Sequence, residues 1–224
     1  MKNLALFDLD HTLLPIDSDY EWGEFLTRVG AVDGDAYRAR NDAFFAQYQA
    51  GVLDPVEYLE FALGTLARFP RPELDALHAR YMAEVIEPAI KPRALALVRE
   101  HQAAGDLVAI ITATNHFITA PIAAAFGVEH HIGALPEYDA QGQLTGKLAG
   151  TPTSGAGKIT HMHAWLGRLG HTFEMFERSH FYSDSHNDIP LLSIVTHPVA
   201  TNPSTKLATH AREQGWPTLH LFND

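Results

Sequence analysis

The stretch that decides the fold is Leu4-Ala5-Leu6-Phe7-Asp8-Leu9-Asp10-His11-Thr12, close to the start of a chain of 224 residues. Its first four residues are apolar, which is typical of a buried strand in a parallel sheet, although a segment of a buried helix would look the same. Residues two apart in a strand face the same way, so we expect Asp8 and Asp10 to point into one crevice. Two carboxylates that close repel each other unless a cation lies between them. Solvated loop acids, or an aspartate that caps the next helix, would explain the pair equally well.

Four further apolar runs alternate with helical patterns along the chain. This alternation predicts an α/β fold with a Rossmann-like parallel sheet, and such sheets bind ligands at the C-terminal ends of their strands. Besides residues 4–7, the predicted strands are residues 107–111, 180–182, 198–200 and 218–222. The helices predicted to lie between them are residues 94–104, 117–126, 158–169, 189–194 and 204–214.

Residues 16–85 differ from the rest, because they lack a strand-like run and show amphipathic helical patterns separated by glycine and proline. We therefore predict a helical cap over residues 16–85, inserted into a core of residues 1–15 and 86–224. Within the core, residues 132–148 are expected to form a small β-hairpin that turns at residues 139–142. The predicted cap helices are residues 20–29, 37–48, 55–69 and 73–85.

Composition narrows the class of protein. The chain has no cysteine, which excludes disulfides, thiol catalysis and cysteine-ligated metal sites. It has 27 Asp and Glu against 16 Lys and Arg, a formal net charge of −11, so neither nucleic acid nor an anionic membrane is an expected partner. No apolar stretch approaches the roughly 20 residues of a transmembrane helix. The two acids beside the first apolar run argue against a signal peptide, and we expect a cytoplasmic enzyme.

Polar residues also follow two of the other predicted strands. Thr112 ends the second strand, where a hydroxyl and free N–H groups can bind an anion, although simple helix capping explains it as well. Asp184 and Asp188 follow the third strand at a spacing that suits Mg²⁺, against the simpler interpretation of an N-cap and a first-turn acid. Lys158 opens a helix after a glycine-containing segment, but that segment lacks the first glycine and the Ser or Thr of a P-loop.

Taken together and in this order, the residues resemble the haloacid dehalogenase superfamily of phosphohydrolases, subfamily IB, and within it the phosphoserine-phosphatase-like branch. The resemblance covers most of the chain, and it implies a parallel-sheet core with an inserted helical cap of the C1 type. The matches are Asp8, Asp10 and Thr12 to the DxDxT signature, Thr112 to the Ser/Thr signature, Lys158 to the Lys signature, and Asp184, Asn187 and Asp188 to the DxxND signature.

The resemblance implies a phosphomonoesterase that works through an aspartyl-phosphate. In this interpretation Asp8 is the nucleophile, and Asp10 is first the general acid and then the general base. Thr112 and Lys158 would bind the phosphate oxygens and stabilise the charge that develops on the transferred group. Asn187 would lie close to the phosphate.

The resemblance also implies Mg²⁺ as the cofactor. Its ligands would be the Asp8 carboxylate, the main-chain carbonyl of Asp10 and the Asp184 carboxylate. Asp188 would support the metal site without binding the ion directly. Ser183 stands where many relatives have Gly, a change too small to threaten the chemistry.

The cap indicates the kind of substrate. In phosphoserine phosphatases an acid after the nucleophile binds the substrate amine, and Asp17 matches that position. Those enzymes also use a cap Arg for the substrate carboxylate, but Ala62 stands at the aligned position here, and Arg38, Arg40 and Arg68 do not match by spacing. We therefore expect the amine half of this recognition site to be present and the carboxylate half to be absent.

Residues 16–85 hold 13 acids and six Arg, a net charge of −7, together with 11 of the 22 aromatic residues. A helical core with a solvated acidic face would account for this composition. An acidic, aromatic cap over a phosphate site also favours a cationic, ring-bearing alcohol, and the favoured substrate is histidinol phosphate. The alternatives are phosphoserine hydrolysis, phosphoryl transfer to another acceptor and a non-catalytic phosphate-binding module. The intact acids disfavour the non-catalytic module.

Histidine is abundant, with 14 residues, but it does not predict a metal site. His130 and His131 are adjacent, and His161 and His163 would point apart on a helix, so neither pair supplies convergent zinc ligands. His11 is expected to point away from the two aspartates, because side chains alternate along a strand.

Overall fold

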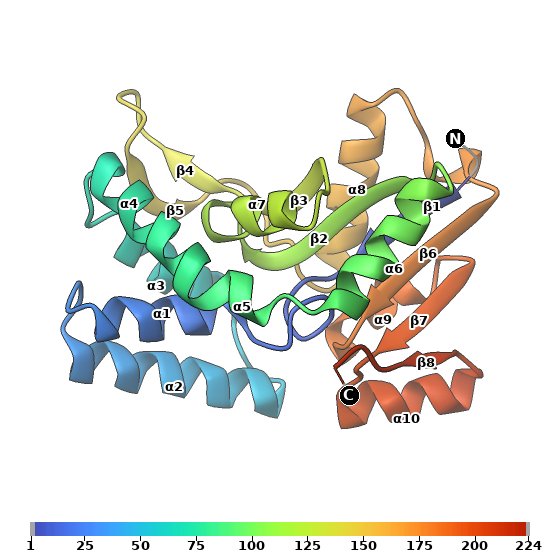
Figure 1. Cartoon of the computed structure of the whole chain (residues 1–224), viewed down its shortest axis with the longest axis horizontal. Coiled ribbons are helices and arrows are strands. Elements are labelled where there is room, and N and C mark those ends of the chain that lie inside the picture. Colours follow the sequence, from blue (N-terminus) through green and yellow to red (C-terminus); the bar gives the residue numbers. More distant parts are fainter. Residues whose placement is uncertain (1–2, 223–224) are drawn as a thin grey trace.

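The computed structural model describes residues 3–222, and at its centre is a six-stranded sheet in which all neighbouring strands are parallel (Figure 1). The strand order is β3-β2-β1-β6-β7-β8, which confirms the predicted α/β architecture. These strands are β1 (Asn3–Phe7), β2 (Leu107–Asn115), β3 (His130–Ala134), β6 (Arg178–Ser183), β7 (His197–Thr201) and β8 (Thr218–Leu219).

Strand β1 lies in the middle of the sheet and is buried on both faces, as its apolar run predicts. Leu4 and Leu6 belong to one hydrophobic cluster, whereas Phe7 belongs to the other. Phe7 is paired with Ile110 of β2 and with Tyr182 of β6. Because the three strands are parallel, the residues that follow them emerge at the same edge of the sheet.

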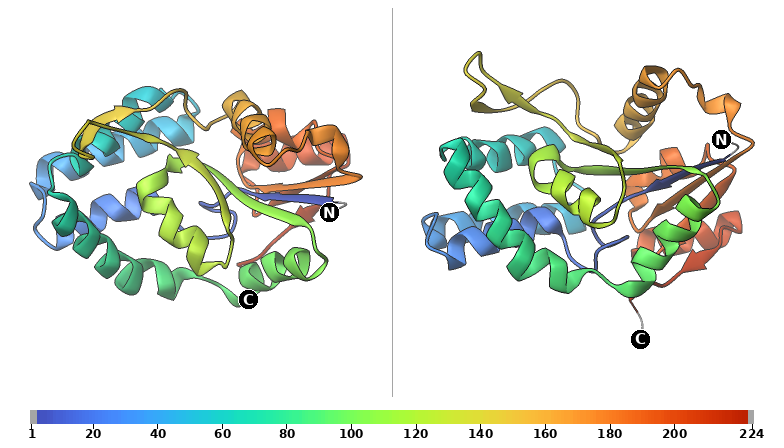
Figure 2. Two further views of the ribbon diagram at one scale, coloured as in Figure 1. Left: turned by 90° about the horizontal axis from the view of Figure 1, so that it is seen from above. Right: turned by 45° about the horizontal axis from the view of Figure 1, so that its top comes forward.

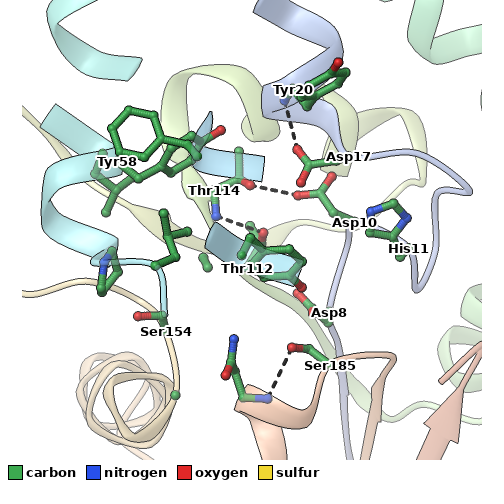
Figure 3. Close-up of a pocket in the computed structure, with 18 of the residues that line it drawn as sticks. Asp8, Asp10, His11, Asp17, Tyr20, Tyr58, Thr112, Thr114, Ser154 and Ser185 are labelled. Atoms are coloured by element: carbon green, nitrogen blue, oxygen red, sulfur yellow. Dashed lines mark hydrogen bonds between the residues drawn. The ribbon is translucent and has the colours of Figure 1, made fainter. Parts of the chain in front are cut away.

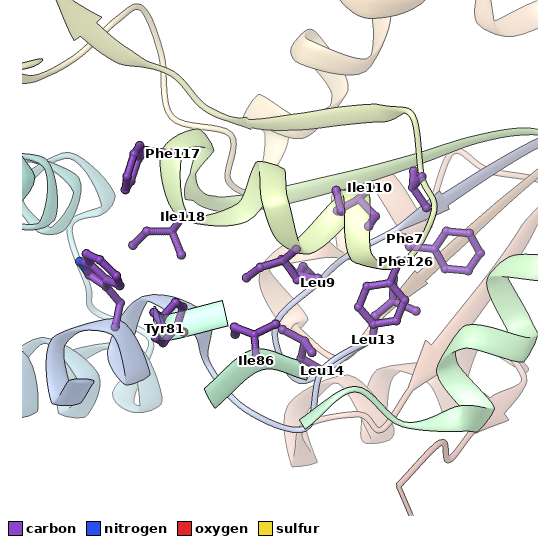
Figure 4. Close-up of a cluster of buried hydrophobic side chains, with 14 of the residues drawn as sticks. Phe7, Leu9, Leu13, Leu14, Tyr81, Ile86, Ile110, Phe117, Ile118 and Phe126 are labelled. Atoms are coloured by element: carbon purple, nitrogen blue, oxygen red, sulfur yellow. The ribbon is translucent and has the colours of Figure 1, made fainter. Parts of the chain in front are cut away.

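Helices cover both faces of the sheet (Figure 2). Helices α6 and α7 contribute to the cluster of Phe7, and α8, α9 and α10 contribute to the cluster of Leu6. Figure 4 shows that the first cluster also takes in Tyr81 and Ile86, from the end of the inserted segment. No helix within residues 3–222 has the length and apolar character to cross a membrane. The helices of this part are α6 (Pro92–Ala103), α7 (His116–Ala125), α8 (Ala156–Arg168), α9 (Ile189–Leu192) and α10 (Thr205–Gln214).

The first four helices after β1 lie at the end of the molecule away from β6, β7 and β8 (Figure 1). The last predicted cap helix was expected to run to Val85, but it changes at Met82–Ile86 into a π-helical turn before α5 (Glu87–Ala89). Pro88 has no N–H to donate to the carbonyl of Glu84, so a regular α-helical ladder cannot continue here. The four helices are α1 (Ser18–Arg28), α2 (Gly34–Ala50), α3 (Pro55–Leu66) and α4 (Arg71–Tyr81).

The division into a cap of residues 16–85 and a core stays a prediction, although the helices of the insert are where it places them. The core assignment of residues 1–2 and 223–224 lies outside the described residues.

The predicted hairpin over residues 132–148 is only partly correct. Its first part belongs to β3, which pairs in parallel with β2, and the hairpin itself consists of β4 (Pro136–Tyr138) and β5 (Leu144–Leu148). An edge strand need not be apolar on both faces, which is why the mixed sequence of β3 was not recognised as part of the sheet. The turn lies where it was expected, with the Asp139 carboxylate accepting main-chain N–H groups of the loop. The hairpin packs against α3 of the insert.

The last predicted strand, residues 218–222, ends early at Leu219. The N–H of Leu221 donates instead to the side-chain oxygen of Asn202, at 2.7 Å. The amide nitrogen of Asn202 donates to the main-chain carbonyl of Thr12, at 3.2 Å. Asn202 therefore connects the end of the chain to the loop that follows β1.

A pair of half-buried histidines gives a prediction about acid stability. His131 of β3 shares a 2.8 Å hydrogen bond with Thr119 through Nε2, whereas its Nδ1 is buried without a partner and its ring lies beside His116. Burial, and then the nearby His116, lower the pKa of His131 from 6.5 to about 3. Because the unfolded chain binds this proton more readily, its contribution to stability is complete above pH 6.5 and is lost as the pH falls.

When the pH falls from 7 to 5, we expect the low pKa of His131 to decrease the free energy of unfolding by about 2 kcal/mol. His131→Gln should therefore lose less stability than the wild-type protein over this range, as measured by urea unfolding at both pH values. His220→Gln, at an exposed position, is the matched control. An equal loss in the wild-type protein and in His131→Gln would contradict the prediction.

Candidate active site

A cavity of about 320 Å³ lies where the C-terminal ends of β1 and β2 face the helices of the insert. Its residues fall into two groups, and Figure 3 shows many of them. The core lines it with acids, small hydroxylated residues and one lysine, whereas the insert lines it mainly with aromatic rings. The core residues are Asp8, Asp10, His11, Thr112, Ala113, Thr114, Ser154, Gly155, Lys158, Ser185, Asn187 and Asp188, and the others are Asp17, Tyr20, Asn41, Phe44, Phe45, Tyr48, Gly51, Leu53, Pro55, Tyr58 and Leu59.

Asp8 lies directly after β1 and is nearly buried, with an exposed fraction of 7%. Its Oδ1 accepts the N–H of Leu9 at 2.9 Å and lies 3.0 Å from the Lys158 ammonium. Burial raises the pKa of Asp8 well above its ordinary value, the charge of Lys158 opposes this, and Asp188 and Asp184 add to it. The carboxylate is thus held in one position in a site where negative charge is costly.

Lys158 is almost fully buried, at 2% exposure, between two carboxylates. Its Nζ lies 2.6 Å from Oδ2 of Asp188 as well as 3.0 Å from Asp8. Burial alone would lower the pKa of Lys158, but Asp188 and Asp8 together raise it above its ordinary value, so the side chain stays charged. The glycine-containing segment before it has a packing role, because a Cβ at Gly157 would collide with the carbonyl of Pro152.

Asp10 is oriented by two donors from different parts of the chain. The N–H of Ser18 donates to Oδ1 at 2.7 Å. The hydroxyl of Thr114 donates to Oδ2 at 2.8 Å, as Figure 3 shows. The N–H of Thr114 in turn donates to the Thr112 hydroxyl at 3.2 Å. Thr114 was not predicted as a site residue. Its place two residues after Thr112, on the same side of a strand, was the available signal.

Asp184 and Asp188 are both buried and have different partners. The Thr12 hydroxyl donates to Asp184 at 3.1 Å and accepts the Asp184 N–H at 2.9 Å. Burial raises the pKa of Asp184 to about 7. Asp188 accepts the Ser183 hydroxyl at 2.7 Å on the oxygen that faces Lys158. Ser183 therefore orients the partner of the lysine, a role that the sequence interpretation did not assign to it.

The buried ammonium of Lys158 contacts two buried carboxylates, those of Asp8 and Asp188. A third buried carboxylate, that of Asp184, lies near enough to interact electrostatically with Asp8 and Lys158. This excess of negative charge in a desolvated site fits a bound cation, and oxygen donors suit Mg²⁺. Among residues 3–222, however, no three side chains of His, Asp or Glu group closely enough to form a metal cluster by themselves. The metal role of these residues, through the carboxylates of Asp8 and Asp184 and the main-chain carbonyl of Asp10 with Asp188 in support, therefore stays a prediction.

Asp17 caps α1 through Oδ1, which accepts the N–H groups of Asp19 and Tyr20 at 3.0 and 2.9 Å. Its carboxylate lies next to that of Asp10 at the cavity (Figure 3). Burial, and then the charge of Asp10, raise the pKa of Asp17 to about 6. Two adjacent carboxylates that face a cavity attract a cation into it.

The expectation for His11 is wrong. Its ring borders the cavity near Asp10, because the chain has left the strand geometry and His11 has a φ of 56°. Strand alternation therefore no longer applies at this residue. The His11 ring lies close enough to the acids to oppose part of the rise in the pKa of Asp17 and of Asp184 that burial causes.

No cap arginine reaches the cavity. Arg38 pairs with Glu24 at 3.4 Å and Arg40 pairs with Glu57 at 2.7 Å, both on the exposed surface. Ala62, at the aligned position, is buried. Among the described residues that line the cavity, Lys158 is the only Lys or Arg.

The sheet order, the insert after β1 and the buried lysine between two aspartates define a class of phosphohydrolase. The family model of the haloacid dehalogenase-like hydrolases matches residues 5–193, and the chain belongs to this family. This confirms the resemblance inferred from the sequence.

The similar proteins narrow the class further. Histidinol-phosphatase of Neisseria meningitidis is 44% identical over 221 residues, which covers 99% of this chain and 100% of that protein. Phosphoserine phosphatase SerB1 of Mycobacterium tuberculosis is 33% identical over 218 residues, which covers 95% of this chain and 68% of that protein. A solved structure from Bordetella pertussis Tohama I, of a protein with unknown function, has 48% identity and a TM-score of 0.95, covering 99% of this chain and 100% of that one. These relatives indicate a phosphatase, as predicted.

Proposed function

We propose that the protein is a Mg²⁺-dependent phosphomonoesterase that hydrolyses histidinol phosphate through a phosphorylated Asp8. The observation that carries this proposal is the contrast between the two ends of one cavity. At the core end Lys158 is buried between two aspartates, and at the other end the lining is acidic and aromatic without a Lys or Arg.

In the first half of the proposed reaction, an oxygen of Asp8 attacks phosphorus while the bond from phosphorus to the substrate oxygen breaks. The leaving oxygen takes a proton from Asp10, which the hydroxyl of Thr114 orients toward the cavity. Lys158 and Thr112 stabilise the negative charge on the transferred phosphoryl group.

In the second half, water attacks phosphorus, and the bond between phosphorus and Asp8 breaks. Asp10, now unprotonated, takes the proton of the water molecule as this bond forms. Inorganic phosphate and the free Asp8 carboxylate are the products. Asn187, which borders the cavity, is proposed to contact the phosphate.

Mg²⁺ is proposed to bind the carboxylates of Asp8 and Asp184 and the main-chain carbonyl of Asp10. When bound, it supplies positive charge that neutralises phosphate oxygens. Asp188 is proposed to act indirectly, since it holds Lys158 and accepts the Ser183 hydroxyl. The raised pKa values of Asp8 and Asp184 support a site that favours a neutralising charge.

The distal part of the substrate is proposed to be an amine and a ring. Asp17 faces the cavity beside Asp10, and this pair favours an ammonium group. The rings of Phe44, Phe45 and Tyr58 favour a flat, apolar-faced group next to it. The name of the Neisseria relative supports the same choice.

We expect histidinol phosphate to have a kcat/KM roughly 100-fold higher than that of phosphoserine. The carboxylate of phosphoserine would enter a partly desolvated, acidic cavity that has no arginine to pair with it, which costs several kcal/mol. The measurement is steady-state release of phosphate from both substrates. Comparable or faster turnover of phosphoserine would show that the substrate proposal is wrong.

Asp17→Asn should reduce this preference, mainly by raising KM for histidinol phosphate, because amine binding is equal in the ground and transition states. Asparagine is also a good N-cap, so α1 should stay intact. Asp35→Asn, at an exposed position of α2, is the matched control and should leave the preference unchanged.

Phosphoserine hydrolysis is the second candidate, since the Mycobacterium relative is a phosphoserine phosphatase. The lack of a Lys or Arg at the insert end of the described cavity disfavours it. Phosphoryl transfer to another acceptor would use the same Asp8, and the orientation of Asp10 toward the cavity favours water as the acceptor.

A further inference from the structure

The tyrosine hydroxyl groups of the insert half of the cavity lie beside polar neighbours. The Tyr20 hydroxyl donates to Asp42 at 2.8 Å, and the Tyr58 and Tyr48 hydroxyls lie near Asp19 and Ser185. These hydroxyls do not by themselves account for the recognition of a substrate ring, so we consider the remaining polar group of this half.

Asn41 is the one amide on this side of the described cavity, and its orientation is determined by its neighbours. Its Nδ2 donates to the main-chain carbonyl of Tyr20 at 3.3 Å. The same nitrogen would lie 2.9 Å from a Cβ at Gly23, so α1 and α2 approach closely here only because residue 23 has no side chain. One N–H of the Asn41 amide is therefore engaged with the main chain of α1, in a closely packed contact between α1 and α2.

The amide oxygen of Asn41, Oδ1, is the part of the side chain that can still bind a ligand. The residue is 2% exposed and lines the cavity, and no described residue donates a hydrogen bond to its Oδ1. This oxygen is also not one of the fully enclosed unpartnered side-chain atoms of the described residues, so it keeps an open side on which a ligand donor can bind. Unlike the carboxylate of Asp17, it is neutral, so it selects a donor without requiring a charge.

Aromatic rings line the same cavity as this acceptor. Tyr20 and Phe45 lie with their ring centres 5.1 Å apart, and Phe44 and Tyr58 with theirs 5.4 Å apart. Flat rings of this kind bind the faces of another flat ring, and the amide oxygen then selects for an N–H at its edge.

We propose that Asn41 is a specificity-determining residue whose Oδ1 accepts a hydrogen bond from a ring N–H of the substrate. The inference rests on the proposed function and adds to it how the enzyme recognises a nitrogen heterocycle rather than any aromatic group. It predicts that a substrate with the same amine and phosphate, but a ring without N–H, is disfavoured.

The test compares histidinol phosphate with phenylalaninol phosphate, which keeps the amine and the phosphate and replaces imidazole by phenyl. The wild-type enzyme should prefer the imidazole by about 10- to 100-fold in kcat/KM, the equivalent of one buried hydrogen bond. Asn41→Leu should remove most of this preference by raising KM for histidinol phosphate, with little change in kcat. Asn41→Ala should do the same without filling the space for the ring.

Phosphoethanolamine, which has no ring, should be hydrolysed equally by both variants and by the wild-type enzyme, and this shows that the catalytic groups are intact. Gln49→Leu removes an exposed amide from the same helix and should change nothing. If the wild-type enzyme does not hydrolyse histidinol phosphate, the proposed function fails and the role of Asn41 fails with it. If it does, but both variants keep the wild-type preference over phenylalaninol phosphate, only the role of Asn41 is overturned.

Discussion

Asp8→Asn should lower kcat by at least about 10⁴-fold, because it removes the oxygen that attacks phosphorus. The substitution is nearly isosteric, and the new side chain can still accept the N–H of Leu9. Lys158 keeps Asp188 as its partner, so no buried charge is left unpaired. We therefore expect a folded, inactive protein.

The measurement combines phosphate release with circular dichroism and thermal unfolding. Asp35→Asn, the exposed control, should retain wild-type activity. A folded Asp8→Asn protein with a tenth of wild-type activity would show that Asp8 is not the nucleophile. Acid-quenched wild-type enzyme should carry phosphate on Asp8 during turnover, and this signal should disappear in the variant.

Removal of divalent metal should reduce activity to background, and added Mg²⁺ should restore it. The physical reason is the excess of buried negative charge at Asp8, Asp184 and Asp188, which one lysine does not balance. Asp184→Asn should raise the Mg²⁺ concentration for half-maximal activity by at least about 10-fold. Its amide oxygen can still accept the Thr12 hydroxyl, so the loop should keep its conformation.

A second readout does not depend on activity. Mg²⁺ that binds only the folded state raises the temperature of unfolding, and Asp184→Asn should require more Mg²⁺ for the same rise. Full activity of the wild-type enzyme in EDTA would mean that the carboxylates do not form a metal site.

Much of the fold followed from local sequence patterns. The run of residues 4–7 is apolar on both faces, which is typical of a central strand of a parallel sheet, and its alternation with helical patterns along the chain favoured the strand over a buried helix. Parallel strands place their C-terminal ends at one edge, so the order of Asp8, Thr112 and Asp184 along the chain was enough to gather them at one site. Strand β3 was missed because an edge strand does not need a continuous apolar sequence.

Periodicity and residue type at the ends of strands predicted most of the sheet and the helical insert, and the resemblance to a known family added the roles of the acids and of Lys158. Which partner each polar group has depends on the tertiary structure. Thr114 reaches Asp10 across 104 positions of sequence, and Asn41 borders the cavity because α2 packs closely on Gly23 of α1. Such contacts depend on how distant elements approach one another, and no local pattern in the chain encodes that distance.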